Sequence, residues 1–326
     1  MRTWTKFKED YLAITDDSTD NETQGETYIN DSIRTVCNLQ GGKLRFLETV
    51  EEILTVEDQE AYEIPNNIRK VIDVWVQVGS GTTATIYMPE MIFDPTRWKV
   101  ILAYRLGTND FPYFTYVENR KIKLQPIPSS NDNILTLRGR KQIKDLSIAD
   151  YEDGTITTAT LDGTTIVGSG TTWTSGMVGQ YIKISDGNAS NLGDNMWYEI
   201  ASITDTTHLE LVKPYQGTSI VAGSASYIIG QTSVIPEAYD TAVVYRSGAL
   251  YWQDKGDTDK SKRYWMMYDG GKEAGYSNDY GGIILEMLEN EGETEEGAYI
   301  PPAGRGGGMI MQAPYYFPYQ LATVFS

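Results

Sequence analysis

The chain has 326 residues, 40% of them hydrophobic and 22% charged, which is enough apolar surface to exclude wholesale disorder. Its net charge of −18 argues against tight binding of a phosphate backbone, because there are no surplus cations to release counterions. A single Cys and a single His exclude an intrachain disulfide and a Cys/His zinc site.

The first 45 residues predict two helices. Thr3 is suited to cap a short helix that carries Trp4, Phe7 and Tyr11 on one face. A polar stretch over residues 16–25 separates it from a second helix, which stops at Gly41-Gly42. The second helix carries one apolar stripe, formed by Ile29, Ile33, Val36 and Cys37.

Residues 46–150 predict a β domain, because the hydrophobic period changes from 3.6 toward 2. The strands expected there are β-branched, alternating and bounded by Gly or Pro. They cover residues 68–78, 85–87, 121–125 and 134–138.

Residues 151–232 predict an inserted module, a small β-sandwich or barrel, because they are rich in Thr, Ser and Gly with frequent turn signals. Asp162-Gly163 is expected to form a hairpin turn in which Gly takes a positive φ. The expected strands cover residues 155–161, 164–168, 180–184, 197–203, 208–212 and 226–229.

Helical spacing returns after Pro236. A heptad-like stripe predicts a helix that ends near Gly256, and Asp257 is suited to cap a second helix. The aromatic residues of these two helices are Tyr245, Trp252, Tyr264, Trp265 and Tyr268. Residues 1–45 and 233–285 together predict one helical bundle, so the expected class is α+β.

Residues 286–326 predict an extended tail with an acidic part, a Gly/Pro-rich tether and an aromatic end. Such an end on a tether is expected to dock on its own fold or on a neighbour. The candidate docking residues are Met309, Met311, Tyr315, Tyr316, Phe317 and Tyr319.

No residue pattern predicts catalysis, a cofactor or a metal site. His208 begins an alternating strand, where a lone His is usually exposed or hydrogen-bonded, and Cys37 fits a small core residue. The oxygen-rich loop 186–194 lacks EF-hand spacing and is expected to be a plain hydrophilic loop. The chain lacks the apolar runs of a signal peptide or a membrane span, so we expect a protein made in the cytoplasm.

The order of three segments resembles the head-to-tail adaptor (neck or connector) proteins of tailed bacteriophages. A helix beginning Tyr28-Ile29-Asn30-Asp31-Ser32-Ile33-Arg34 leads to Phe46-Leu47-Glu48 and then to a Tyr-x-Ile-Pro segment with a Val/Ile-rich strand, residues 62–71. One extra residue between Pro65 and Ile68 departs from the family pattern. Residues 251–257, followed by Lys260, Tyr264 and Tyr268, resemble the helix–Gly-Asp–helix hairpin of the same proteins.

The resemblance implies a structural virion protein of the neck. It would form a closed ring, usually of twelve copies, beneath the portal protein and receive the tail, a nozzle or a second neck protein. Genome DNA would pass through without specific binding, and no membrane would be involved. The five aromatic residues of the 245–268 region would be ring contacts, and the aromatic C-terminal segment would dock on the portal or a neighbouring subunit.

Two readings from other classes compete with this one. The chain could be a tail-associated adhesin whose 151–232 module binds glycans, if Trp173, Trp197 and Tyr198 were exposed. It could also be a cell-wall hydrolase that uses a carboxylate pair, although nothing singles out two acids among 45.

Overall fold

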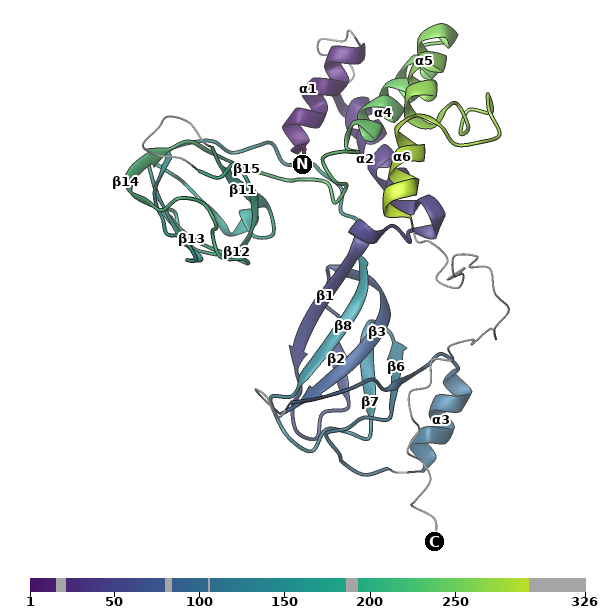
Figure 1. The fold of residues 1–326 in the computed structure, drawn as a ribbon, viewed down its shortest axis with the longest axis vertical. Coiled ribbons are helices and arrows are strands. Elements are labelled where there is room, and N and C mark those ends of the chain that lie inside the picture. Colours follow the sequence, from purple (N-terminus) through teal and green to yellow (C-terminus); the bar gives the residue numbers. More distant parts are fainter. Residues whose placement is uncertain (16–21, 80–83, 105, 186–192, 293–326) are drawn as a thin grey trace, which may run out of the picture. The chain divides into compact units, whose positions relative to one another are not determined.

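The computed structural model describes residues 1–15, 22–79, 84–104, 106–185 and 193–292. These residues form both helices and antiparallel-dominated sheets, which confirms the predicted α+β class (Figure 1). No helix in this described part of the chain has the length and apolar character needed to cross a membrane. The six candidate docking residues of the aromatic C-terminal segment lie outside the described ranges.

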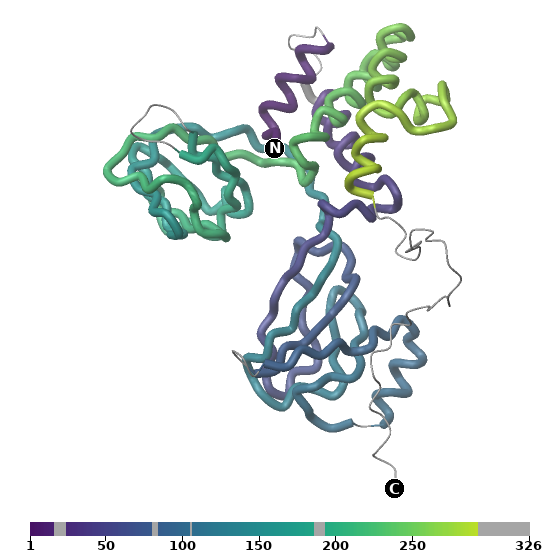
Figure 2. Tube along the Cα trace, viewed as in Figure 1, coloured from purple at the N-terminus to yellow at the C-terminus, as the bar shows by residue number. Residues whose placement is uncertain are grey.

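Helices from both ends of the described chain share one hydrophobic core. In Figure 2 the chain leaves this helical bundle after its first helices and returns to it near residue 233. The helices are α1 (Trp4–Thr15), α2 (Glu22–Asn38), α4 (Thr241–Asp254), α5 (Thr258–Asp269) and α6 (Gly282–Glu291).

The predicted stripes of α1 and α2 are buried in this core. Trp4, Phe7 and Tyr11 are at most 2% exposed, and the backbone N–H of Lys6 donates to Thr3 Oγ1 at 3.3 Å, which is the expected cap. The stripe from Ile29 to Cys37 is likewise buried.

The polar gap predicted through Gly25 is too long, because α2 already begins at Glu22. Gly25 lies against α1, where an added Cβ would approach the Tyr11 ring to 2.5 Å. Its role is therefore close helix packing within α2, whereas the sequence suggested a loop.

Residues 48–141 form two four-stranded sheets with a shared core. The sheet orders are β1-β8-β3-β4 and β2-β7-β6-β5. Apolar side chains from both sheets make up the core, among them Val74 and Leu137 from one and Tyr62 and Ile122 from the other. The strands are β1 (Glu48–Leu54), β2 (Ala61–Glu63), β3 (Ile68–Val78), β4 (Thr85–Tyr87), β5 (Glu90–Ile92), β6 (Phe114–Glu118), β7 (Lys121–Gln125) and β8 (Ile134–Lys141).

This region also contains a helix that the sequence reading did not predict, α3 (Pro95–Ala103). Asp94 caps it by accepting from the backbone N–H of Thr96 at 2.8 Å, and Pro95 occupies the first turn. The Asp-Pro pair was the available signal for this helix.

Residues 155–230 form one curled seven-stranded sheet in the order β14-β9-β10-β13-β12-β11-β15. The two edge strands, β14 and β15, are separated in the chain by Ser226 alone, so the sheet must curl until its edges meet there. The strands are β9 (Thr155–Ala159), β10 (Thr165–Ser169), β11 (Tyr181–Ile184), β12 (Trp197–Asp205), β13 (His208–Leu211), β14 (Ile220–Ala225) and β15 (Tyr227–Gly230).

Two sequence expectations for this module need correction. β14 was not predicted, because its Gly and Ser residues resemble a loop. The turn between β9 and β10 forms as expected, but the positive φ, 61°, belongs to Asp162 rather than to Gly163. Asp tolerates the left-handed region better than most residues, which explains why Asp162 can take the positive φ that was expected of Gly163.

Candidate assembly surface

The α4–α5 hairpin carries the aromatic residues singled out in the sequence. α4 ends at Asp254, Gly256 takes a φ of 75°, and the Asp257 side chain accepts from the backbone N–H of Lys260 at 3.0 Å. A left-handed glycine followed by a capping aspartate reverses the chain within three residues. The predicted helix–Gly-Asp–helix hairpin is therefore present.

Two of the five candidate contact residues lie in the core of the helical bundle. Trp265 is 3% exposed and Tyr268 is 1% exposed, and their ring centroids are 5.8 Å apart. Burial raises the pKa of the Tyr268 hydroxyl well above its ordinary value, with the nearby Glu273 carboxylate adding to the effect. These side chains stabilise the bundle and present little surface to a partner.

The other three candidates, Tyr245, Trp252 and Tyr264, are partly exposed and lie near the end of α1. The Tyr245 and Tyr264 rings are 6.5 Å apart. Trp252 Nε1 donates to the Ile14 carbonyl oxygen at 3.2 Å, and Tyr264 Oη donates to the same oxygen at 3.5 Å. We call these three residues the aromatic strip.

A cation covers one end of the aromatic strip. Lys260 Nζ lies 3.6 Å from the centroid of the Trp252 ring, within the range of a cation–π interaction. Half-exposed aromatic side chains beside a cation have the composition that protein–protein contacts favour.

Arg246, which follows Tyr245 in α4, is buried. Its Nη1 donates to Asp31 Oδ2 at 2.6 Å, while Nε and Nη2 donate to the Glu273 carboxylate at 3.0 and 2.6 Å. Burial alone lowers the pKa of Arg246, but the hydrogen bonds to Glu273 and Asp31 outweigh it and raise that pKa. Arg246 thus joins α2, α4 and the segment after α5.

Sequence reasoning missed Arg246. It is the only charged residue between Thr241 and Gln253, in an otherwise apolar helix. Since a buried charge requires a paired partner, this lone Arg was a usable signal for an ion-pair cluster.

The α2 motif that carried the family resemblance, residues 28–34, forms hydrogen bonds to α4 and to the chain after β8. We call this motif the α2 hub. Tyr28 and Asp31, three residues apart, reach α4: Tyr28 Oη donates to the Asp254 carboxylate, and Asp31 accepts from Arg246. Residues at i and i+3 share a helix face, so one side of α2 is committed to this helix pair.

The other side of the same motif holds the chain as it returns from β8. Asn30 Nδ2 donates to the Leu146 carbonyl at 2.9 Å, and the Leu146 N–H donates to Asn30 Oδ1 at 2.9 Å. Arg34 Nε donates to Asp145 Oδ1 at 2.9 Å. The asparagine side chain therefore pairs with a backbone unit as a strand would, which explains why this position suits an amide.

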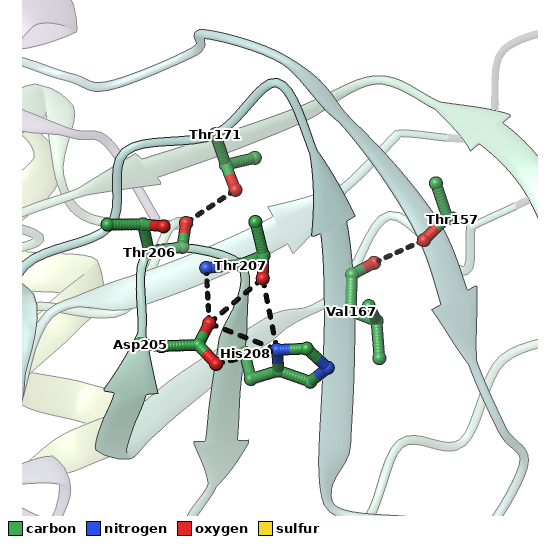
Figure 3. Close-up of polar contacts among 7 residues, drawn as sticks. All are labelled: Thr157, Val167, Thr171, Asp205, Thr206, Thr207 and His208. Atoms are coloured by element: carbon green, nitrogen blue, oxygen red, sulfur yellow. Dashed lines mark hydrogen bonds and ion pairs between the residues drawn. The ribbon is translucent and has the colours of Figure 1, made fainter.

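His208 is the first residue of β13, directly after the turn that follows β12, and it is partly exposed, as expected for a lone His at a strand start (Figure 3). Its Nδ1 is 3.0 Å from both Asp205 carboxylate oxygens and 3.0 Å from Thr207 Oγ1. The backbone N–H of Thr207 and the His208 ring lower the pKa of Asp205 to about 2. The Thr207 hydroxyl also donates to Asp205 Oδ1 at 2.9 Å, so the three side chains together close a turn (Figure 3).

The oxygen-rich loop predicted over residues 186–194 lies mostly outside the described residues. Within the described ranges, no group of three or more His, Cys, Asp or Glu side chains is placed to hold a metal ion. Cys37 is buried, and this burial raises the pKa of its thiol to about 12.

The aromatic residues on which the glycan-binding alternative depended are largely covered. Trp173 is 2% exposed and its Nε1 donates to Tyr227 Oη at 2.9 Å, and Tyr198 is 8% exposed. Trp197 is half-buried, with Lys183 Nζ 5.1 Å from its ring centroid. These residues do not form an open platform for a sugar face.

Comparison with known proteins also indicates a structural protein. The model of the SU10 adaptor protein family matches residues 2–165, half of the chain. No curated protein matches the chain. The matched region includes the α2 motif and the whole of the two-sheet domain, so the chain belongs to the SU10 adaptor protein family, a family of structural phage proteins.

Proposed function

We propose that this protein is the head-to-tail adaptor of a tailed phage, a ring beneath the portal that joins the capsid to the tail. The observation that carries the proposal is the family match over residues 2–165, which includes the α2 hub and the two-sheet domain. The chain would be a virion component made in the host cytoplasm. Its partners would be further copies of itself, the portal protein, and a tail, nozzle or second neck protein.

The aromatic strip is evidence in favour of assembly into a closed ring of subunits. A closed ring needs a heterologous contact, in which one surface of a subunit meets a different surface of the next. Tyr245, Trp252 and Tyr264 present partly exposed aromatic rings on the α4–α5 hairpin, and Tyr and Trp are enriched among the residues that contribute most to contact energies. A ring of about twelve copies is the expected size, as the family resemblance implies.

The charge of the chain fits a conduit for DNA. A net charge of −18 per subunit repels a phosphate backbone, so passing DNA would not be held. The adhesin alternative lacks comparable support, because Trp173 and Tyr198 are buried.

Negative-stain electron microscopy of the purified chain, alone and mixed with the portal protein of the same phage, tests the proposal. Rings that form spontaneously or only on the portal are the expected result. Dispersed monomers in both samples would contradict it, and glycan binding by the 151–232 module would then be measured. Clearing of peptidoglycan in a zymogram would support the hydrolase reading instead.

A further inference from the structure

The sheet β1-β8-β3-β4 carries apolar residues on its outer side. Val74 of β3 and Leu137 of β8 point into the core shared with the second sheet, so their neighbours along these strands point outward. Across the four strands, the register aligns on this outer side Leu54, Ile134, Gln77 and Ile86. Leu54 and Ile86 are 57% and 63% exposed, and Val50, on the same side of β1, is 53% exposed.

These outward apolar residues are uncovered. Among the described residues, Val50, Leu54 and Ile86 take part in none of the four buried hydrophobic clusters. An antiparallel sheet often has one side in solvent, but that side is then usually polar. We call the outer side formed by Val50, Glu52, Leu54, Ile134 and Ile86 the sheet face.

Helix α3 lies on the opposite side of the same domain. Its buried residues Trp98 and Ile101 pack on β5 and β6, and the Trp98 ring stacks on Tyr116 with centroids 5.3 Å apart. Tyr116 is on the outer side of its sheet, because it pairs with Lys123, whose neighbours along β7 point into the core. The layers therefore run helix, sheet, sheet, with α3 on one side and the sheet face on the other (Figure 1).

The side of α3 that points away from its own sheet is mixed in character. Positions 96, 99, 100 and 103 follow the i, i+3, i+4, i+7 spacing of one helix side, and all four residues there are exposed. We call Thr96, Lys99, Val100 and Ala103 the α3 stripe. Thr96 and Ala103 are small, so a flat surface can approach the helix closely and contact Val100, which is 50% exposed.

The two faces differ in charge. Residues 95–104 contain two cations and no acid, whereas residues 48–63, which form β1, the loop after it and β2, contain seven acids and no cation. Arg97 is already held in an ion pair within the domain. Lys99 and Glu52 are both exposed, and neither forms an ion pair with another described residue. Each face therefore presents a free charge, and the two charges have opposite signs.

These charges favour contact between unlike faces of two copies. Two α3 stripes placed together would oppose Lys99 to Lys99, and two sheet faces would oppose Glu52 to Glu52, which is unfavourable in both cases. A stripe against a sheet face pairs opposite charges and covers apolar surface on both sides. Because the two faces lie on opposite sides of one domain, each copy can offer one and receive the other, which is the contact that closes a ring.

We propose that the α3 stripe of one copy packs on the sheet face of the next copy, with Val100 against Leu54 and Lys99 close to Glu52. Helix α3 would then lie between two sheets, as helices do in layered folds. The inference rests on the proposed ring and deepens it by naming two surfaces that meet in it.

Disulfide formation between full-length copies tests the contact. Val100→Cys and Leu54→Cys are made as separate chains, and native Cys37 is retained because burial raises the pKa of its thiol to about 12. The two chains are mixed, alone and with the portal protein of the same phage, and oxidised mildly before a non-reducing gel. The control mixture replaces Leu54→Cys by Val221→Cys, since Val221 is an exposed strand residue of the seven-stranded sheet.

The expected result is a dimer that forms at least about tenfold faster in the Val100/Leu54 mixture than in the control mixture, because contact raises the local thiol concentration. Either variant alone should give little dimer, and one chain with both cysteines should give a ladder of multimers. Rapid dimerisation of Val100→Cys alone would show that two α3 stripes meet and would overturn the proposal.

Charge reversal tests the Lys99–Glu52 pair. Lys99→Glu in the Val100→Cys chain, or Glu52→Lys in the Leu54→Cys chain, should slow cross-linking about fivefold or more, because each places like charges together. Both reversals combined should restore the rate. Lys213→Glu in the Val100→Cys chain is the control for net charge, since Lys213 is exposed and lies outside both faces. Equal slowing by Lys213→Glu and by Lys99→Glu, without recovery in the combined reversal, would remove the pair from the contact.

The outcome separates this contact from the ring. Rings in electron microscopy without faster cross-linking than in the control mixture would show that the ring closes through another surface, and this proposal would fail alone. Faster cross-linking in samples without closed rings would support the contact and contradict the ring. Absence of both rings and cross-links, with and without portal protein, would overturn both proposals.

Discussion

Arg246 and Glu273 form a bidentate ion pair, with Nε to Oε2 at 3.0 Å and Nη2 to Oε1 at 2.6 Å. The pair joins the centre of α4 to the segment that follows α5, and the third contact, to Asp31, adds α2. A planar guanidinium with its donors in a fixed fork suits this three-way junction, which a lysine ammonium could not satisfy in the same way.

Replacement of this arginine should destabilise the folded chain. Arg246→Met removes the hydrogen bonds to Glu273 and Asp31, and the free energy of unfolding should fall by about 2–3 kcal/mol. The loss stays below the upper range for buried pairs because Glu273 and Asp31 are 35% and 50% exposed and can be hydrated. Urea denaturation measures it.

Arg34→Met is the matched control. Arg34 and Asp145 are 52% and 49% exposed, and a surface pair of this kind contributes under about 1 kcal/mol. Equal losses for the two arginine variants would contradict the junction assigned to Arg246.

The Asn30–Leu146 pairing should be sensitive to loss of the amide. Asn30→Ala removes both hydrogen bonds and leaves the Leu146 backbone groups unpaired, so a loss of about 1–2 kcal/mol is expected in thermal unfolding. Asn290→Ala is the control, because Asn290 is exposed and its side chain bonds only to Glu286 in the same helix. A loss at Asn290 as large as that at Asn30 would count against the hub.

The aromatic candidates should separate into two groups. Tyr268→Ala opens a cavity in the core and should cost about 3–5 kcal/mol of stability. Tyr245→Ala, on the aromatic strip, should leave the thermal midpoint much closer to that of the unmodified chain and reduce ring formation. Thermal unfolding and sedimentation velocity measure the two effects, and rings that persist undiminished in Tyr245→Ala would remove the strip from the interface.

Asp240 should make stability depend on pH. Burial raises the pKa of this carboxyl to about 6, against partial opposition from Arg2. The folded state therefore binds a proton more readily than the unfolded chain, whose carboxyl has a pKa near 4. Stability should rise as the pH falls from above 6 toward 4, because protonation relieves the cost of a buried carboxylate.

Asp240→Asn isolates this contribution. The difference in unfolding free energy between the native chain and the variant should change across pH 4–6 and level off on either side. Urea denaturation at fixed ionic strength and several pH values measures it. A difference that is constant across this window would show that Asp240 does not titrate there.

Local signals in the sequence predicted much of the helical hairpin. The stripe through Tyr245 and Trp252, the stop at Gly256 and the cap at Asp257 are all encoded within a few residues of where they act. In contrast, α3 was missed because its apolar residues surround the helix and give no amphipathic period.

Contacts between residues far apart in the chain could not be predicted from local sequence signals. The partners of Arg246 are 27 and 215 positions away in the chain, and no spacing rule connects them. The burial of Trp265 and Tyr268, in contrast with the partial exposure of Tyr264, likewise depends on how the other helices pack around α5.

Because Ser226 alone separates β14 from β15, many copies of this module can lie close together with fewer open strand edges. Many copies held close together in a virion would bring exposed strand edges within reach of one another, and such edges invite strand exchange and fibrous association. The module brings the first and last strands of its sheet together at Ser226, and an isolated bridge from Tyr151 to Ile229 pairs part of the β15 edge, so less of these edges is open to a neighbour. Copies of such a module can lie at high local density and still remain separate folded units.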